Sequence, residues 1–146
     1  GLCQCTNLLY WMTLHTPLTV VERWRHSYDV FPDNGRTQPF GSGATCAWPS
    51  LDLQVENRTA DTFRLVLGVT GTHLVGAWTA DAPAVVRYEV YEQTHLMTND
   101  RPGVFTRHNV LRRRVLALDG TLVADEPLTE NHARLMYQPF LEGPRP

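Results

Sequence analysis

The side chains with the greatest chemical potential are concentrated in the first fifty residues of the chain. All three cysteines, Cys3, Cys5 and Cys46, lie there, and His26 follows in the segment WRHSYD. A thiolate is a strong nucleophile, a nearby imidazole can take its proton, and a carboxylate can orient the imidazole. Cys3, His26 and Asp29 therefore predict a nucleophile, its general base and the group that orients the base.

A helix is predicted over residues 3–16, and it would place Cys3 in its first turn. Pro17 ends this helix, because the residue before a proline is pushed away from helical dihedral angles. Apolar residues recur with helical spacing, and a second, more polar face has the same spacing. The apolar stripe is Cys5, Leu8, Leu9 and Met12, and the polar face is Cys3, Thr6, Asn7 and Tyr10. Free backbone N–H groups and the helix dipole would stabilise a thiolate on Cys3.

Other interpretations of the same residues stay open. Free cysteines are usually small buried hydrophobic side chains, and His26 would then be an ordinary loop histidine. A metal site could use Cys3 and Cys5 with His15, His26 or Cys46. Two cysteines that are two positions apart on a helix point about 200° away from each other, so they would not chelate one ion. We therefore predict no metal ligands and no cofactor.

Length and composition predict one globular domain over residues 1–146. The chain has 146 residues, 42% of them hydrophobic and 19% charged, and a net charge of −2. This balance shows no electrostatic footprint for nucleic acid. No apolar run approaches the roughly 18 residues that a membrane-spanning helix needs. Three cysteines do not make a disulfide framework. The chain starts at Gly1, immediately before a cysteine motif, so we expect an upstream segment to be missing.

From residue 51 onward the hydrophobic pattern changes to the period of two that is typical of strands. Strands are predicted at residues 19–24, 51–56, 63–69, 73–79, 85–91, 104–118 and 121–124, and a second short helix at 129–137. Asp119-Gly120 is a strong hairpin signal, and Asn34-Gly35 is a turn signal in the irregular segment 25–47. The predicted fold class is α+β, with one N-terminal helix packed on a largely antiparallel β-sheet.

Several stretches, in this order and spacing, resemble the VanW family. They are GLCQCTNLLYWMTLHTPLTVVERWRHSYDVFPD, RTQPFGSGATC, THLVGAW, RYEVYE and TENHARLMYQPFL. The family's opening motif is a glycine run, a hydrophobic residue and Cys-Gln, which falls on Gly1, Leu2, Cys3 and Gln4. Its Arg-His-Ser-Tyr motif falls on residues 25–28. The chain starts inside the glycine run, and Cys5 stands where an aliphatic residue is expected.

The resemblance implies a bacterial protein that is linked to the cell envelope and to glycopeptide resistance. On this basis we expect an accessory protein that acts on peptidoglycan or a precursor fragment, as a cysteine-dependent acyl transferase or hydrolase. The alternatives are a non-catalytic module that binds an envelope ligand, with Trp24, Tyr28 and Trp48 as stacking surfaces, and a thiol-based redox or metal sensor. The expected ligand-binding residues are Gln4, Asn7, Trp24, Arg25, Ser27 and Tyr28.

Overall fold

A computed structural model describes residues 1–30, 32 and 37–139. Phe31, residues 33–36 and residues 140–146 lie outside the described part. So do the Asn34-Gly35 turn signal and the last two residues of the TENHARLMYQPFL motif. The described residues form helix α1 (Leu2–Leu14) and strands β1 (Thr19–Glu22), β2 (Tyr28–Asp29), β3 (Gln54–Glu56), β4 (Phe63–Val69), β5 (Leu74–Ala80), β6 (Val86–Arg101), β7 (Val104–Ala117) and β8 (Leu122–Leu135).

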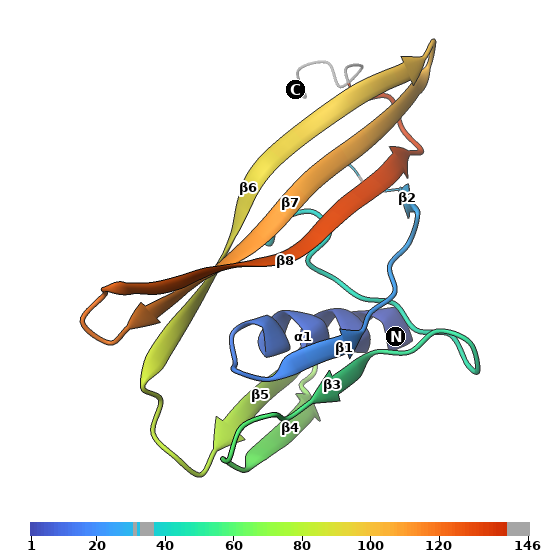
Figure 1. The fold of residues 1–146 in the computed structure, drawn as a ribbon. Helices are drawn as coiled ribbons and strands as arrows, with labels where there is room; N and C mark the ends of the chain where they lie inside the picture. The colour runs from blue at the N-terminus through green and yellow to red at the C-terminus, as the bar shows by residue number, and fades with distance from the viewer. Residues whose placement is uncertain (31, 33–36, 140–146) are drawn as a thin grey trace.

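The strands form three sheets. The largest has the order β2-β8-β7-β6. The other two sheets have two strands each, and they pair β1 with β3 and β4 with β5. All pairs are antiparallel except β2, which runs parallel to β8. Figure 1 shows the long blade of β6, β7 and β8 beside a smaller layer in which α1 packs on β5 and β1. The α+β class and the antiparallel pairing are confirmed, but the strands are divided among three sheets and do not form a single one.

The face of α1 that is buried differs from the apolar stripe in the sequence. The buried residues are Thr6, Tyr10, Thr13 and Leu14, whereas the apolar stripe from Cys5 to Met12 is only half-buried. Threonine tolerates burial here because each hydroxyl finds a partner. The Thr6 hydroxyl donates to the Ala44 carbonyl at 2.8 Å, and the Thr13 hydroxyl accepts from the Trp78 indole at 3.1 Å. The predicted polar face therefore forms the contact with the rest of the chain.

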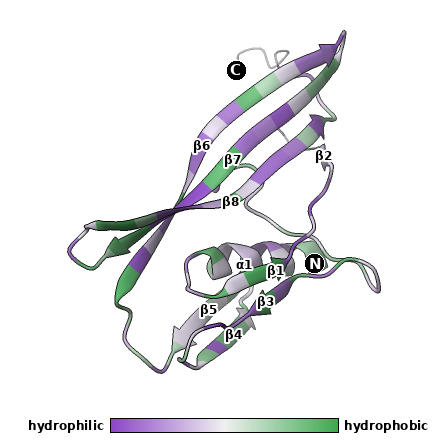
Figure 2. Ribbon diagram, in the orientation of Figure 1, coloured by the Kyte–Doolittle hydropathy of each residue, from purple (hydrophilic) through white to green (hydrophobic). Residues whose placement is uncertain are grey.

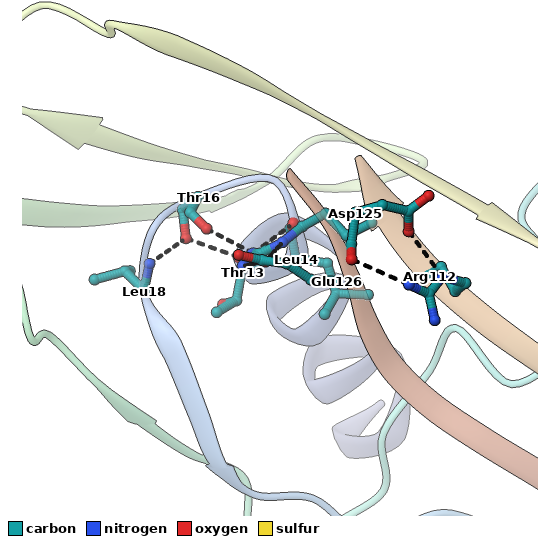
Figure 3. A network of polar contacts seen from close by, with 8 residues as sticks. Thr13, Leu14, Thr16, Leu18, Arg112, Asp125 and Glu126 are labelled. Atoms are coloured by element: carbon teal, nitrogen blue, oxygen red, sulfur yellow. Dashed lines mark hydrogen bonds and ion pairs between the residues drawn. The ribbon is translucent and has the colours of Figure 1, made fainter. Parts of the chain in front are cut away.

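The C-terminal end of α1 is held by an arginine from the long sheet. Arg113 of β7 donates from Nη1 to the carbonyl oxygens of Leu14 at 3.1 Å and Thr16 at 2.9 Å. Its Nη2 lies 2.6 Å from the Glu126 carboxylate. A cation at this end complements the helix dipole and satisfies carbonyls that have no partner within the helix. Figure 3 shows Leu14 and Thr16 beside Glu126, and the Thr16 hydroxyl also accepts from the Leu18 backbone N–H at 3.2 Å. Arg113 thereby ties the small layer to the long sheet.

The helix predicted at residues 129–137 is wrong, because residues 122–135 form β8. Asn131, Ala133 and Leu135 are buried, and they alternate with the exposed residues His132 and Arg134. This period of two matches a strand that is paired along its length with β7. The cap-like Thr129-Glu130 pair is a local signal, and tertiary pairing overrides it.

Other predicted boundaries agree with the structure to within a few residues. The hairpin at Asp119-Gly120 and the pair β4–β5 are confirmed, while β6 continues ten residues beyond the predicted end at residue 91. Figure 2 shows hydrophobic residues at the β7–β8 hairpin end and a more hydrophilic upper sheet. Within the described residues, no helix has the length and apolar character needed to cross a membrane.

Candidate functional site

A pocket of about 720 Å³ lies between the first turns of α1 and two further segments of the chain. Helix α1 supplies Cys3, Gln4 and Asn7. The chain around β2 supplies residues 25–30, and the loop before β3 supplies residues 38–44. Cys3, His26 and Asp29, the three residues predicted to do chemistry, all line this pocket.

Cys3 sits in the first turn of α1, as the sequence predicts. Its thiol is half-buried, and its Sγ atom lies 3.1 Å from the Thr45 hydroxyl. The Gln4 backbone N–H donates to the Gly1 carbonyl at 3.2 Å, so Gln4 offers the pocket its side-chain amide and not its backbone donor. Among the described residues, the observed partner of the thiol is therefore a hydroxyl from the loop before β3.

His26 lies between β1 and β2 with its side chain exposed. Its ring makes no hydrogen bond to any described residue. The orientation of the imidazole is therefore not fixed by a hydrogen bond to the described part of the chain.

Asp29 has partners other than the expected one. Its side chain is 5% exposed, and Oδ2 lies 3.3 Å from Nη1 of Arg107, whose side chain is 2% exposed. The Tyr137 hydroxyl donates to the same oxygen at 3.2 Å, and Arg107 donates to Tyr137 at 3.0 Å. Asp29 therefore neutralises a buried arginine beneath the pocket, and the predicted hydrogen bond to His26 is absent from the described structure.

The segment that forms this pocket matches a known protein family. The family described as VanW like protein matches residues 1–79, which is more than half of the 146 residues. This match includes every residue that lines the pocket. The chain belongs to the VanW family.

One curated relative is the vancomycin B-type resistance protein VanW of Enterococcus faecalis. It is 28% identical over 137 residues, which cover 94% of this chain and 50% of that protein. The chain thus spans about half the length of this relative. No solved structure matches the chain.

Arg23 organises one wall of the VanW-family pocket, and the sequence analysis did not single it out. Its guanidinium donates to the Gly43 carbonyl from Nε at 2.9 Å and from Nη2 at 2.7 Å, and to the Gly41 carbonyl. Nη1 donates to Thr129 at 3.0 Å and Asn131 at 3.1 Å. Burial lowers the pKa of Arg23, but a guanidinium stays protonated in proteins. The loop of residues 41–43 is thereby fixed to β8.

Two buried asparagines extend this wall into the long sheet. Asn131 is 0% exposed and Asn109 is 1% exposed, and they pair at 2.8 Å. Asn109 also donates to the Phe40 carbonyl at 2.6 Å and to Glu92 at 2.6 Å. Gly41 has a positive φ of 74°, and a Cβ there would lie 2.3 Å from the Asn131 amide. A glycine is needed at this position for both reasons.

The remaining predicted ligand residues divide into two groups. Asn7, Arg25, Ser27 and Tyr28 line the pocket with Gln4, but Trp24 and Trp48 are not among the described lining residues. The Trp24 indole donates to Glu22 at 2.6 Å, and Trp48 is 95% exposed. Arg25 donates to the His132 carbonyl, and burial lowers its pKa. Of the three aromatic residues predicted as stacking surfaces, Tyr28 is the one that lines the pocket.

Gly43→Ala tests the fit between α1 and the pocket loop. A Cβ on Gly43 would lie 2.3 Å from Oδ1 of Asn7, the atom that accepts from the Ala44 backbone at 2.9 Å. We expect the variant to lose about 1–2 kcal/mol of unfolding free energy, because a partly buried hydrogen bond is broken. Urea unfolding followed by circular dichroism measures this loss. Gly71→Ala is the matched control, since nothing lies within 4 Å of a Cβ there. Equal effects at both positions would contradict the assigned contact.

The described residues contain no group of three or more histidine, cysteine or acidic side chains placed to hold a metal ion. Cys3, Cys5 and Cys46 are all free thiols. The lining of the pocket includes a thiol, an imidazole, side-chain amides, hydroxyls, a carboxylate and two guanidinium groups.

Proposed function

We propose that this VanW-family chain serves resistance to vancomycin-type glycopeptides, with its pocket acting on peptidoglycan or a precursor through Cys3 and His26. The observation that carries the proposal is that the thiol and the imidazole line one pocket together with the hydrogen-bonding side chains of Gln4 and Asn7. The printed name of the Enterococcus faecalis relative supports the biological setting.

The proposed chemistry is acyl transfer at a carbonyl of the ligand. The Cys3 thiolate attacks the carbonyl carbon, and His26 takes the thiol proton. The C–N or C–O bond to the leaving group then breaks, and His26 returns the proton to the departing amine or alcohol. Water or an acceptor amine then releases the acyl group from the thioester. The Gln4 side-chain amide is the candidate donor to the oxyanion.

This proposal uses two residues and not three. Because Asp29 is paired with Arg107, the imidazole has no carboxylate to orient it in the described structure. Cysteine needs less help than serine, since a thiol is intrinsically more acidic and more nucleophilic. The proposed machinery is therefore a Cys-His pair.

The test compares the three free cysteines. Cys3→Ala is expected to abolish turnover of a soluble peptidoglycan fragment, or complementation in a glycopeptide-resistance assay, with an unchanged unfolding midpoint. Cys5→Ala and Cys46→Ala are the matched controls and should keep activity. Alkylation followed by mass spectrometry should show that Cys3 reacts faster than Cys5 and Cys46. The substitution His26→Ala should slow the alkylation of Cys3 to the rate of the other two cysteines. Full activity in Cys3→Ala would exclude the nucleophile.

A non-catalytic binding module is the second candidate, and the Arg107–Asp29 pair is the observation that favours it. With Asp29 engaged, the pocket still presents the Arg25 guanidinium, which suits a carboxylate, and the Tyr28 ring. In that case Cys3→Ser keeps binding of the peptidoglycan fragment, measured by calorimetry, whereas Arg25→Gln and Tyr28→Ala weaken it. Turnover that depends on Cys3 would rule this candidate out.

A further inference from the structure

A histidine pair lies on the long sheet, outside the pocket and outside every role proposed above. His108 of β7 and His132 of β8 are register partners on adjacent antiparallel strands, so their side chains share one face of the sheet. Their Nδ1 atoms are 2.6 Å apart, and the ring planes are inclined by 67°. His132 is accessible, with 48% of its side chain exposed.

The outer nitrogen of each ring faces an acceptor. Nε2 of His132 lies 3.3 Å from the Glu130 carboxylate. Nε2 of His108 lies 2.9 Å from the Thr98 hydroxyl, which itself donates to Asp100 at 2.7 Å. Hydrogen bonds from Thr106 and Thr98 lower the pKa of Asp100, so this carboxylate is an acceptor at neutral pH.

These neighbours favour the tautomer with the proton on Nε2 in both rings. A carboxylate accepts only, so its contact of 3.3 Å with His132 suits a proton on Nε2 of that ring. The Thr98 hydroxyl has given its proton to Asp100, so it accepts from Nε2 of His108. In two neutral rings, both Nδ1 lone pairs then point at each other across 2.6 Å. Two opposed lone pairs at this distance repel unless a positive charge lies between them.

We propose that His108 and His132 bind a divalent transition-metal ion, such as Zn²⁺, through their two Nδ1 atoms. Imidazole is a preferred ligand of such ions. Glu130 and the Thr98–Asp100 pair hold the outer N–H groups, as second partners of metal-bound histidines do. Water or a donor atom from a bound molecule completes the coordination, because only two protein ligands converge here.

The distance between the rings fits this assignment after a small movement. Zinc–nitrogen bonds of about 2.0–2.1 Å at a tetrahedral angle separate the two nitrogens by roughly 3.3 Å. The observed 2.6 Å must therefore open by about 0.7 Å, and the exposed His132 ring can supply this by rotation.

The experiment titrates the chain with Zn²⁺ alone and follows the histidine ring nitrogens by long-range ¹H–¹⁵N NMR. We expect both Nδ1 signals of His108 and His132 to shift together while both Nε2 atoms keep their protons. Calorimetry should show that His132→Gln removes this binding step and that Glu130→Gln weakens it by about tenfold to a hundredfold.

His95→Gln is the matched control, because His95 lies in the same sheet beside Glu92, with no second histidine as its register partner. It should leave the zinc step unchanged. The proposal is overturned if zinc leaves both Nδ1 signals in place and the pair holds only a shared proton, or if zinc shifts only His26 and the cysteines. None of these readings depends on activity of the pocket.

Discussion

Replacing Arg23 by methionine is expected to lower the unfolding free energy by about 3–5 kcal/mol, since it removes the donor from several partly buried acceptors at once. Those acceptors are the carbonyls of Gly41 and Gly43, the Thr129 hydroxyl and the Asn131 amide. The guanidinium also lies over the Tyr10 ring, 4.6 Å from its centroid. Urea unfolding followed by tryptophan fluorescence measures the loss.

Arg23→Lys should recover little of this stability. An ammonium is a compact charge with no planar fork, so it cannot serve two loop carbonyls and two β8 side chains together. Arg58→Met is the control, because among the described residues Arg58 forms only an exposed pair with Glu56. Exposed pairs contribute about 0–1 kcal/mol. A stable Arg23→Lys variant would show that charge alone, and not the fork geometry, holds the loop.

Arg23 also links stability to the pocket. The carbonyls that it binds belong to the loop that forms one wall, and Gly43 touches Asn7 on the opposite wall. In Arg23→Met we therefore expect the loop of residues 41–43 to lose its structure at a lower denaturant concentration than the long sheet. Binding of the peptidoglycan fragment should fall at denaturant concentrations where the long sheet is still intact.

Local signals in the sequence predict most of the elements. Pro17, Asp119-Gly120 and the alternation from residue 63 onward act over a few residues, and the corresponding boundaries agree with the structure. The segment from Thr129 fails because its cap-like start competes with pairing to β7, which no short window contains. The division into three sheets is likewise a matter of long-range pairing.

For the pocket too, the sequence predicts residues that local motifs mark and does not predict residues whose partners lie in distant segments. Cys3, His26 and their neighbours were found from residue types and family motifs, and they do gather around one cavity. Arg23 was missed because its partners lie in distant segments, and nothing in its neighbourhood marks it. The sequence predicts Trp24 as a stacking surface for the ligand, but its indole donates to Glu22.

Asp29→Ala is the second large effect, and it separates a structural carboxylate from a catalytic one. Removing Asp29 leaves the Arg107 guanidinium charged and buried, which we expect to cost about 3–5 kcal/mol of unfolding free energy. The double variant with Arg107→Met should regain a large part of that loss, because the unpaired charge is gone. A double-mutant cycle by urea unfolding gives the coupling directly.

The double variant Asp29→Ala with Arg107→Met also tests whether Asp29 orients the imidazole of His26. If Asp29 only neutralises Arg107, the restored fold should carry wild-type alkylation of Cys3, with its dependence on His26 intact. If Asp29 orients the imidazole when a ligand binds, the double variant should be stable and still lose turnover of the peptidoglycan fragment. The structure favours the first outcome, since Oδ2 of Asp29 is already shared by Arg107 and Tyr137.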